Sequence, residues 1–255
     1  MMWRRREIQV LVVSVYCLWV MLAPAHAGTP TTERIAVEAG VKTEITKDLA
    51  LPYNPKEGLS GRTCLDGRPV ADFQGDIVEY WANLECPYCG IQEPLGAQRN
   101  NQDVCIVVRH IPTGEYGGSL KKALSYEALK RFSLNAANLF WDSVVPKTAL
   151  GVPVPYEAAL LAALQEAAIS PEKFTETLTK DASELVSQDI LAAQTRIAST
   201  PTYVLAGIRF TACDFKASEL RSALELARKA RNGDPDALER VIKMITNGLM
   251  NETML

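Results

Sequence analysis

Two stretches of almost continuous apolar residues mark the centre of the chain. Residues 76–82 and 104–111 are rich in β-branched and aromatic side chains, a pattern typical of strands covered on both faces. Between them, residues 86–94 predict a helix that begins at Cys86 and bends at Pro94. Strand, helix and strand in this order predict a βαβ unit with parallel strands.

Helical periodicity dominates the next part of the chain, residues 119–198. Ser119 and Ser170 offer amino-terminal caps, and Pro171 suits the first position of a helix. Residues 151–155, with the sequence GVPVP, divide this helical block into two parts. The pattern predicts a large helical insertion between the second and third strands of a mixed α/β core.

Strand and helix patterns return near the carboxyl terminus. Residues 202–211 predict two short strands that turn at Gly207. Residues 217–230 form an amphipathic helical pattern, and a further short helix is expected from Pro235 to about Gly248.

The amino terminus has the three parts of a secretory signal peptide. Residues 1–7 are basic, residues 8–23 are an apolar run, and small residues precede a cleavage site after Ala27. The alternative is an uncleaved membrane anchor, but a spanning helix needs roughly 20 apolar residues. We therefore expect a mature chain from Gly28, not stably inserted in a membrane, in the oxidising periplasm. Its first part, residues 28–62, is punctuated by proline and glycine and predicts a loosely held arm with one short strand near residues 35–45.

Composition and charge narrow the classes of function. The 255 residues are 47% hydrophobic and 22% charged, which excludes a disordered, collagen-like or polytopic membrane protein. The formal net charge of −3 and the lack of a basic run beyond the leader give little electrostatic reason to bind nucleic acid. Six cysteines are too few for a disulfide scaffold.

The candidate chemistry lies in the sequence Cys86-Pro87-Tyr88-Cys89. At the start of a helix, unpaired backbone N–H groups and the helix dipole stabilise the thiolate of Cys86. Cys86 is therefore the expected attacking and leaving sulfur, and Cys89, one turn later, resolves the mixed disulfide. Pro87 fits the first helical turn. Pro87 and Tyr88 lie between the two sulfurs, where they would set how strongly the thiolate form of Cys86 is preferred.

Two structural interpretations compete with redox chemistry. A zinc site would need two more ligands, and the remaining cysteines and histidine form no second paired motif. An inert disulfide rarely closes so short a loop, because little chain entropy is removed. The position of the pair after a strand in a βαβ unit favours redox function.

On these residues, the sequence resembles the DsbA-like branch of the thioredoxin superfamily. The motifs that carry the resemblance, which covers about residues 70–230, are VEYWANLECPYC at 78–89, VRHIP at 108–112 and STPTYV at 199–204. The resemblance implies an α/β thioredoxin-like fold with a large helical insertion, and a thiol-disulfide oxidoreductase that needs no cofactor. The expected units are a signal peptide (1–27), an arm (28–62), a thioredoxin-like core (63–118 and 199–232), an inserted helical domain (119–198) and a helical tail (233–255).

The resemblance also assigns site residues outside the cysteine pair. It implies that Pro201 is cis and faces the cysteines, and that Thr200 offers its backbone to an extended substrate segment. An ordinary trans proline that opens a strand is the alternative. An acid beneath the redox helix is implied to pass protons to the buried cysteine, and Glu79 is the candidate. Glu79 is seven residues before Cys86, however, where the family has its acid six before, so a bulge near residues 83–84 or an outward-facing carboxylate is expected.

Other polar residues near the pair have two interpretations. His110 ends the second predicted strand, on the same side as the redox helix, and is either a structural partner or a group that tunes the thiolate and contacts substrates. Glu85, next to Cys86, is expected to be a solvated loop acid.

Three cysteines remain in the mature chain besides the redox pair, so at most one more bridge can form and one thiol is left over. Cys105 lies in an apolar strand and is interpreted as a small core residue. Cys64 and Cys213 are the candidates for a bridge between the arm and the end of the hairpin.

Three functions remain open from the sequence. The first is a dithiol oxidase that introduces disulfides into exported proteins and is itself reoxidised by a membrane partner. The second is an isomerase or reductase kept in the reduced state, although residues 28–62 look short and proline-broken for the oligomerisation segment that such proteins usually carry. The third is a non-catalytic metal carrier or binding module on the same scaffold.

Overall fold

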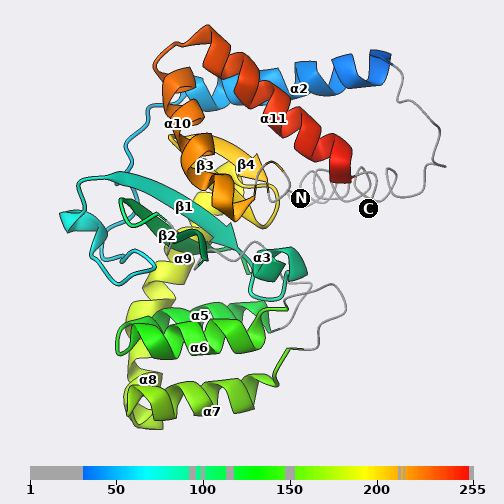
Figure 1. The fold of residues 1–255 in the computed structure, drawn as a ribbon. Helices are drawn as coiled ribbons and strands as arrows, with labels where there is room; N and C mark the ends of the chain where they lie inside the picture. Colours follow the sequence, from blue (N-terminus) through cyan, green and yellow to red (C-terminus); the bar gives the residue numbers. More distant parts are fainter. Residues whose placement is uncertain are drawn as a thin grey trace, which may run out of the picture.

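A four-stranded sheet lies at the centre of the molecule (Figure 1). The computed structural model describes residues 31–91, 96–98, 101–112, 118–146, 153–211, 214 and 216–252. The strands are β1 (Asp76–Ala82), β2 (Val104–His110), β3 (Thr202–Leu205) and β4 (Ile208–Thr211), in the spatial order β2-β1-β3-β4. β1 and β2 are parallel, whereas β3 is antiparallel to both β1 and β4. The predicted parallel pair and the hairpin that turns at Gly207 are confirmed.

The two faces of the sheet are covered by different parts of the chain. Val78, Tyr80 and Ala82 of β1 point to one face, which we call the redox face, and join the main hydrophobic core. Ile77 and Trp81 point to the other, the rear face, and pack in two smaller clusters. Because β2 is buried at every position, its unbroken apolar pattern is explained by cover on both faces.

The helices expected between the second and third strands are present: in Figure 1 the first four lie below the sheet, and the last runs from them up to the sheet beside β2. They are α5 (Ser119–Lys130), α6 (Leu134–Val144), α7 (Tyr156–Ala167), α8 (Pro171–Thr177) and α9 (Ser183–Arg196), with a π-helical turn at Leu178–Ala182. The Ser170 side chain accepts a hydrogen bond from the Lys173 N–H, which confirms the predicted cap. The cap predicted at Ser119 is wrong, because Gly118 holds the cap position and Ser119 is already helical.

The amino-terminal segment is a helix rather than the loose arm with a strand that was expected. α2 (Thr31–Ala50) spans the residues predicted as a strand at 35–45. Ile45 is buried against the core, and the Asp48 carboxylate accepts hydrogen bonds from the backbone N–H and Nε of Arg209 on β4. Arg231 donates to the Asp48 carbonyl, so the end of α2 is held by residues far away in the sequence.

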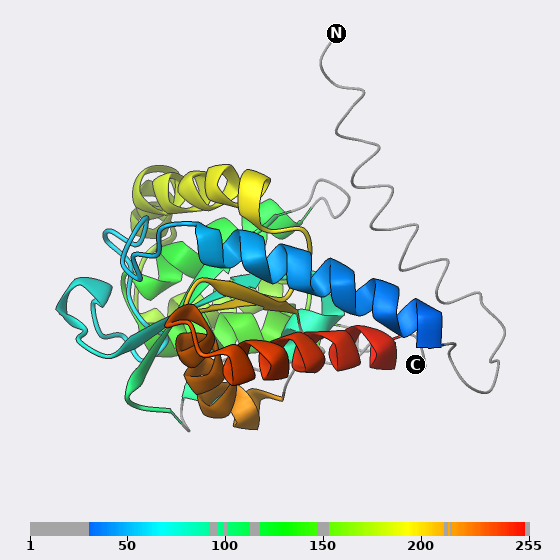
Figure 2. The same cartoon turned by 90° about the horizontal axis from the view of Figure 1, so that it is seen from above.

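The carboxyl-terminal helices differ from expectation mainly in length. A 3₁₀ turn (Ala217–Glu219) leads into α10 (Leu220–Arg231), and α11 (Pro235–Glu252) continues through Gly248, where an end was expected. α11 lies along α2 (Figure 2), and this contact supports its longer run. Within the described ranges, no helix combines the length and the apolar character needed to cross a membrane.

Candidate redox site

The cysteine pair lies where β1 ends and α3 (Pro87–Ile91) begins. The Cys86 N–H donates to the Asn83 carbonyl at 3.0 Å, and the Cys89 N–H donates to the Cys86 carbonyl at 3.1 Å. The helix therefore starts one residue later than expected, with Cys86 just before its first residue, where free N–H groups face the sulfur. The bend expected at Pro94 lies outside the described residues.

The two sulfurs differ in access and in acidity. Cys86 is half-buried, whereas Cys89 is fully buried. A hydrogen bond from the Cys89 thiol, opposed by burial and assisted by the Cys89 N–H and the Thr200 side chain, lowers the pKa of Cys86 from near 9 to about 6. Burial raises the pKa of Cys89 well above its ordinary value. The reduced pair therefore holds one proton at neutral pH, and the exposed sulfur is the thiolate.

Neutral aromatic groups surround the buried thiol. The Tyr80 hydroxyl donates to the Cys89 carbonyl at 2.9 Å, and the ring of Tyr203 lies 4.7 Å from that of Tyr80. The Asn83 N–H points to the Cys89 sulfur at 3.4 Å. Burial raises the pKa of both tyrosines, so they stay uncharged over the pH range in which Cys86 titrates.

The Glu79 carboxylate points away from the cysteines, to the rear face, where it accepts a hydrogen bond from Nη1 of Arg109 at 2.8 Å. The register of β1 with β2 is unbroken up to Ala82, so no bulge within the strand returns this carboxylate to the redox face. Tyr80 occupies the position six before Cys86. Of the two expected arrangements, the outward-facing carboxylate is therefore the one observed, and a role of Glu79 in proton transfer to Cys89 stays an untested prediction.

His110 lies at the predicted end of the parallel strand, but its contacts are with the helical insertion. Its Nε2 is 2.9 Å from Oε1 of Glu127, and its ring meets the edge of Tyr126 at 5.6 Å between centroids. Burial alone would raise the pKa of Glu127, yet the charge of Lys130 and the hydrogen bond with His110 lower it. These contacts match the structural interpretation, and the role in tuning the thiolate stays a prediction.

The loop opposite the cysteines has the expected backbone. The Thr200–Pro201 peptide bond is cis, which confirms that prediction. The Cys86 thiol lies 3.4 Å from the Thr200 carbonyl, and the Thr202 hydroxyl donates to the Ser199 carbonyl at 2.8 Å. Residues 114 positions apart in the sequence thus meet at the reactive sulfur.

Comparison with solved structures identifies the fold of this chain. The thiol-disulfide exchange protein α-DsbA2 from Wolbachia pipientis superposes with a TM-score of 0.53 at 15% identity, over 74% of this chain and 97% of that chain. The fold is DsbA-like. ScsC from Proteus mirabilis in a transitional conformation gives 0.52 at 15% identity, over 88% of this chain and 96% of that chain. The sequence matches no protein-family model and no curated protein.

This likeness confirms the expected fold class, a thioredoxin-like α/β core with a large helical insertion. The catalytic domain of Proteus mirabilis ScsC also matches, with a TM-score of 0.50 at 13% identity, over 73% of this chain and 97% of that chain. Identities this low support the fold, and the chemistry rests on the cysteine site itself.

Sequence reasoning missed a charged pair that involves Glu85, the residue before the cysteine pair. Glu85 is not a solvated loop acid, because its Oε1 lies 3.2 Å from Nζ of Lys122 on α5 and both side chains are largely buried. Lys122 also donates to the Val144 carbonyl at 3.3 Å. Gly90 follows the cysteine pair where a Cβ atom would lie 2.0 Å from the Pro146 carbonyl oxygen. A glycine at this point was the one sequence signal that the redox helix approaches the insertion closely.

A disulfide joins Cys64 to Cys105 on the rear face, which overturns two expectations. Cys105 is not a free core residue, and Cys64 does not pair with Cys213, which lies outside the described residues. Both bonded cysteines are fully buried among Leu59, Val70 and other apolar side chains. The disulfide was missed because a cysteine in an apolar strand has the pattern of a core residue, while its partner is fixed by contacts 41 residues apart.

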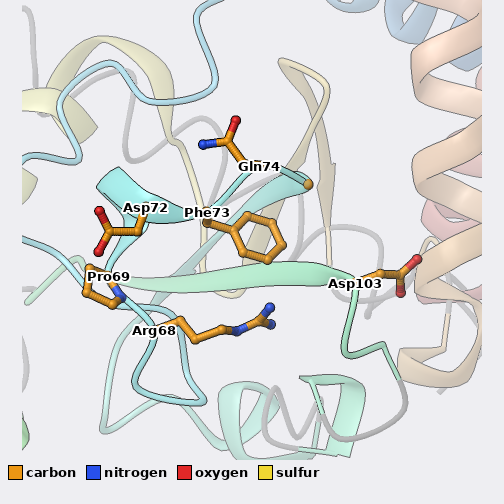
Figure 3. Close-up of a pocket in the computed structure, with 7 residues that line it drawn as sticks. Arg68, Pro69, Asp72, Phe73, Gln74 and Asp103 are labelled. Atoms are coloured by element: carbon orange, nitrogen blue, oxygen red, sulfur yellow. The ribbon is translucent and has the colours of Figure 1, made fainter.

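A hollow of about 430 Å³ lies at the amino-terminal ends of β1 and β2, away from the cysteine pair (Figure 3). The guanidinium of Arg68 stacks over the Phe73 ring at 4.6 Å, and Pro69 and Asp103 complete much of the lining. None of the predicted site residues lines it. Across the described ranges, no three histidine, cysteine or acidic side chains are grouped as a metal site.

Proposed function

We propose that the protein is a thiol-disulfide oxidoreductase that introduces disulfides into exported proteins through Cys86 and Cys89. The observation that carries this proposal is the asymmetry of the two sulfurs: a half-buried Cys86 with a pKa of about 6 beside a fully buried Cys89 whose pKa is raised. A reduced form stabilised as a thiolate makes the corresponding disulfide a stronger oxidant. The asymmetry therefore favours the oxidase over a reductase.

The reaction begins when a substrate thiolate attacks Cys86 in the oxidised pair. The Cys86–Cys89 bond breaks, a mixed disulfide forms at Cys86, and Cys89 leaves and takes up a proton. A second substrate thiolate then attacks the substrate sulfur of the mixed disulfide and releases Cys86 as a thiolate. The substrate loses two electrons and two protons; the pair gains both electrons, Cys89 keeps one proton, and the other goes to solvent.

Substrate binding is assigned to the loop beside the reactive sulfur. The Thr200 carbonyl is adjacent to Cys86, and Pro201, which has no N–H, leaves room for an extended segment to pair with the Thr200 backbone. Tyr88, between the cysteines, is about half exposed and offers an apolar contact. Recognition of the substrate backbone suits a broad range of unfolded chains.

Oxidation of a reduced, unfolded client protein tests the activity. Cys86→Ala and Cys89→Ala should each abolish turnover, whereas Leu161→Ala, an exposed position on α7, should leave it unchanged. The reduction potential of the pair separates the two redox directions: a value near −120 mV supports an oxidase, and one near −270 mV overturns it in favour of a reductase. Stoichiometric metal binding without turnover would favour the carrier module instead.

We also place the mature protein in the periplasm, with a membrane redox partner that reoxidises Cys86 and Cys89. The support is the leader pattern of residues 1–27, which lie outside the described residues, and the need of a catalytic oxidant for an electron acceptor. Cell fractionation with sequencing of the mature amino terminus should find Gly28 first. A retained leader in the membrane fraction would contradict this location.

A further inference from the structure

The Cys64–Cys105 disulfide lies where no second protein can reach it in the folded chain. Both cysteines are fully buried, Cys105 within β2 and Cys64 in the segment between α2 and β1. Leu59, Val70 and Phe73 cover them on the rear face. A second protein can therefore reach these cysteines only before this segment packs against the sheet.

The redox pair of the same folded molecule cannot make this bond. Cys105 is in register with Ile77, near the start of β1, whereas Cys86 follows the end of that strand. From Ile77 to Ala82 the strand runs five residues, about 17 Å. Cys89 packs on the redox face and Cys105 on the rear face, so the sheet separates the two pairs.

An unfolded chain that oxidises its own cysteines faces competing pairings. Cys64 and Cys86 are 22 positions apart, Cys89 and Cys105 are 16 apart, and the native pair is 41 apart. Loop-closure entropy alone favours the two shorter loops by roughly two- to fourfold. In a folded molecule, by contrast, Cys86 lies just before α3 and Cys89 within it, and Cys64 and Cys105 are bonded to each other. These two cysteines therefore cannot form the competing disulfides.

We propose that an unfolded copy of this chain is itself a substrate of the folded, oxidised protein, which makes the Cys64–Cys105 bond in trans. This inference rests on the proposed function and names one of its clients. The thiolate of Cys64 or Cys105 in the unfolded copy attacks Cys86 of the folded copy; the Cys86–Cys89 bond breaks, and Cys89 leaves as a thiolate that takes up one of the two protons lost by the client, while the other goes to solvent. The second of the two thiolates then displaces Cys86; the client loses two electrons and gains its disulfide, and the donor ends as a reduced pair.

The proposed substrate-binding loop at Thr200 and Pro201 recognises backbone rather than particular side chains, so it suits an unfolded copy of this chain. The Thr200 carbonyl and cis-Pro201 at the reactive sulfur suit any extended segment, including residues 59–70 before they pack. Each newly folded chain becomes a further oxidant only after the proposed membrane partner has oxidised its Cys86–Cys89 pair, so maturation is expected to accelerate with the amount of folded, reoxidised protein.

The test uses a reduced, unfolded full-length client with Cys86→Ala and Cys89→Ala, so that only the donor carries a redox pair. Oxidised wild-type protein is the sole oxidant, in equal amount and without oxygen or glutathione. We expect Cys64–Cys105 to form at least tenfold faster than without donor, as mapped by peptide mass spectrometry, with matching reduction of the donor pair. A Cys89→Ala donor, activated at Cys86 with thionitrobenzoate, should be trapped on Cys64 or Cys105.

A client that also carries Cys64→Ala is the matched control and should form no such bond. Reduced, unfolded ribonuclease serves as an unrelated second client. If the donor oxidises ribonuclease but not this chain, or if a Cys86→Ala donor works equally well, the inference is wrong and the proposed function stands. If the donor oxidises neither client, the proposed function fails as well.

Discussion

The two cysteine pairs of this protein lie on opposite faces of the same β1–β2 ladder and have opposite properties. Cys86 and Cys89 are free thiols at the start of a helix, and one of them is accessible. Cys64 and Cys105 form a disulfide that is fully buried. The residue type is the same in all four positions, so access and hydrogen bonding are what distinguish the proposed redox pair from the buried disulfide.

The electrostatic surroundings of the two faces differ as well. On the rear face, the buried Asp189 carboxylate of α9 accepts hydrogen bonds from Arg62 at 2.6 Å and from Arg109 at 2.5 Å, and Arg109 also binds Glu79. These ion pairs fasten the helical insertion to the sheet. On the redox face, the buried Cys89 lies beside the neutral Tyr80, and a hydrogen bond from the Cys89 thiol is the largest cause that lowers the pKa of Cys86. The buried ion pairs thus lie on the rear face, whereas the redox face combines the main hydrophobic core with the free cysteine pair.

Removal of the rear disulfide should give the largest effect. For a loop of 41 residues, the Cys64→Ala, Cys105→Ala variant is expected to lose about 4 kcal/mol of unfolding free energy, because its unfolded chain is no longer cross-linked. Urea unfolding measures the loss, and the Cys86 pKa should be unchanged in the folded variant. A lowered stability accompanied by a shifted Cys86 pKa would contradict the separation of the two faces.

The accessible pair should react far faster with alkylating reagents than the buried one. In the folded protein treated with a mild reductant at pH 7, iodoacetamide should modify Cys86 on the order of 100-fold faster than Cys64 or Cys105. The Cys86 pKa is lowered by folding, so its thiolate is fully formed above pH 7 and is lost as the pH falls through about 6. The alkylation rate should therefore fall about tenfold per pH unit below pH 6. A rate that follows an ordinary thiol, with a midpoint near 8.5, would contradict the assignment.

The charged pair beside Cys86 should have a smaller effect on its acidity. Lys122→Met leaves the carboxylate of Glu85, the residue before Cys86 in the sequence, without its cation, and an uncompensated negative charge near a thiol disfavours the thiolate. We expect the Cys86 pKa to rise by about one unit, measured from thiolate absorbance against pH. Lys122→Arg should keep the wild-type value, and Glu85→Gln combined with Lys122→Met should restore it. If the double variant stays shifted, Lys122 acts through packing and not through charge.

Sequence patterns predicted the elements that are determined by residues close together in the chain. The apolar runs at β1 and β2 gave the parallel pair, and Gly207 marked the hairpin turn. α2 was missed because few of its residues are buried and its carboxyl-terminal end is held by Arg209 and Arg231, which are more than 160 positions away. A sequence pattern records only residues that are close together in the chain, whereas this helix is held by residues that are far away in the sequence.

The candidate site shows the same division. The cysteine pair followed from a short motif, and the cis peptide bond at Pro201 from the resemblance to a family. The Cys64–Cys105 bond depends on where the segment before β1 crosses β2, which no local pattern records. The direction of Glu79, however, was available: neighbouring strand residues alternate between faces, so Glu79 and Tyr80 cannot both lie under the helix. The position six before Cys86 is tyrosine, and that residue faces the buried thiol.

The smallest effect is expected from the hydroxyl that Tyr80 places under the cysteine pair. Tyr80→Phe keeps the ring but leaves the Cys89 carbonyl without this donor, at a cost of about 1 kcal/mol in unfolding free energy. Tyr126→Phe is a matched control: Tyr126 is equally buried, but its hydroxyl finds no hydrogen-bond partner among the described residues, so no loss is expected. Equal losses in the two variants would mean that ring packing dominates at both sites. If Tyr80→Phe alone also changes the ratio of thiol-disulfide exchange rates at Cys86 and Cys89, the hydroxyl holds the buried sulfur in line for attack. An effect on stability alone would restrict Tyr80 to anchoring α3 on the sheet.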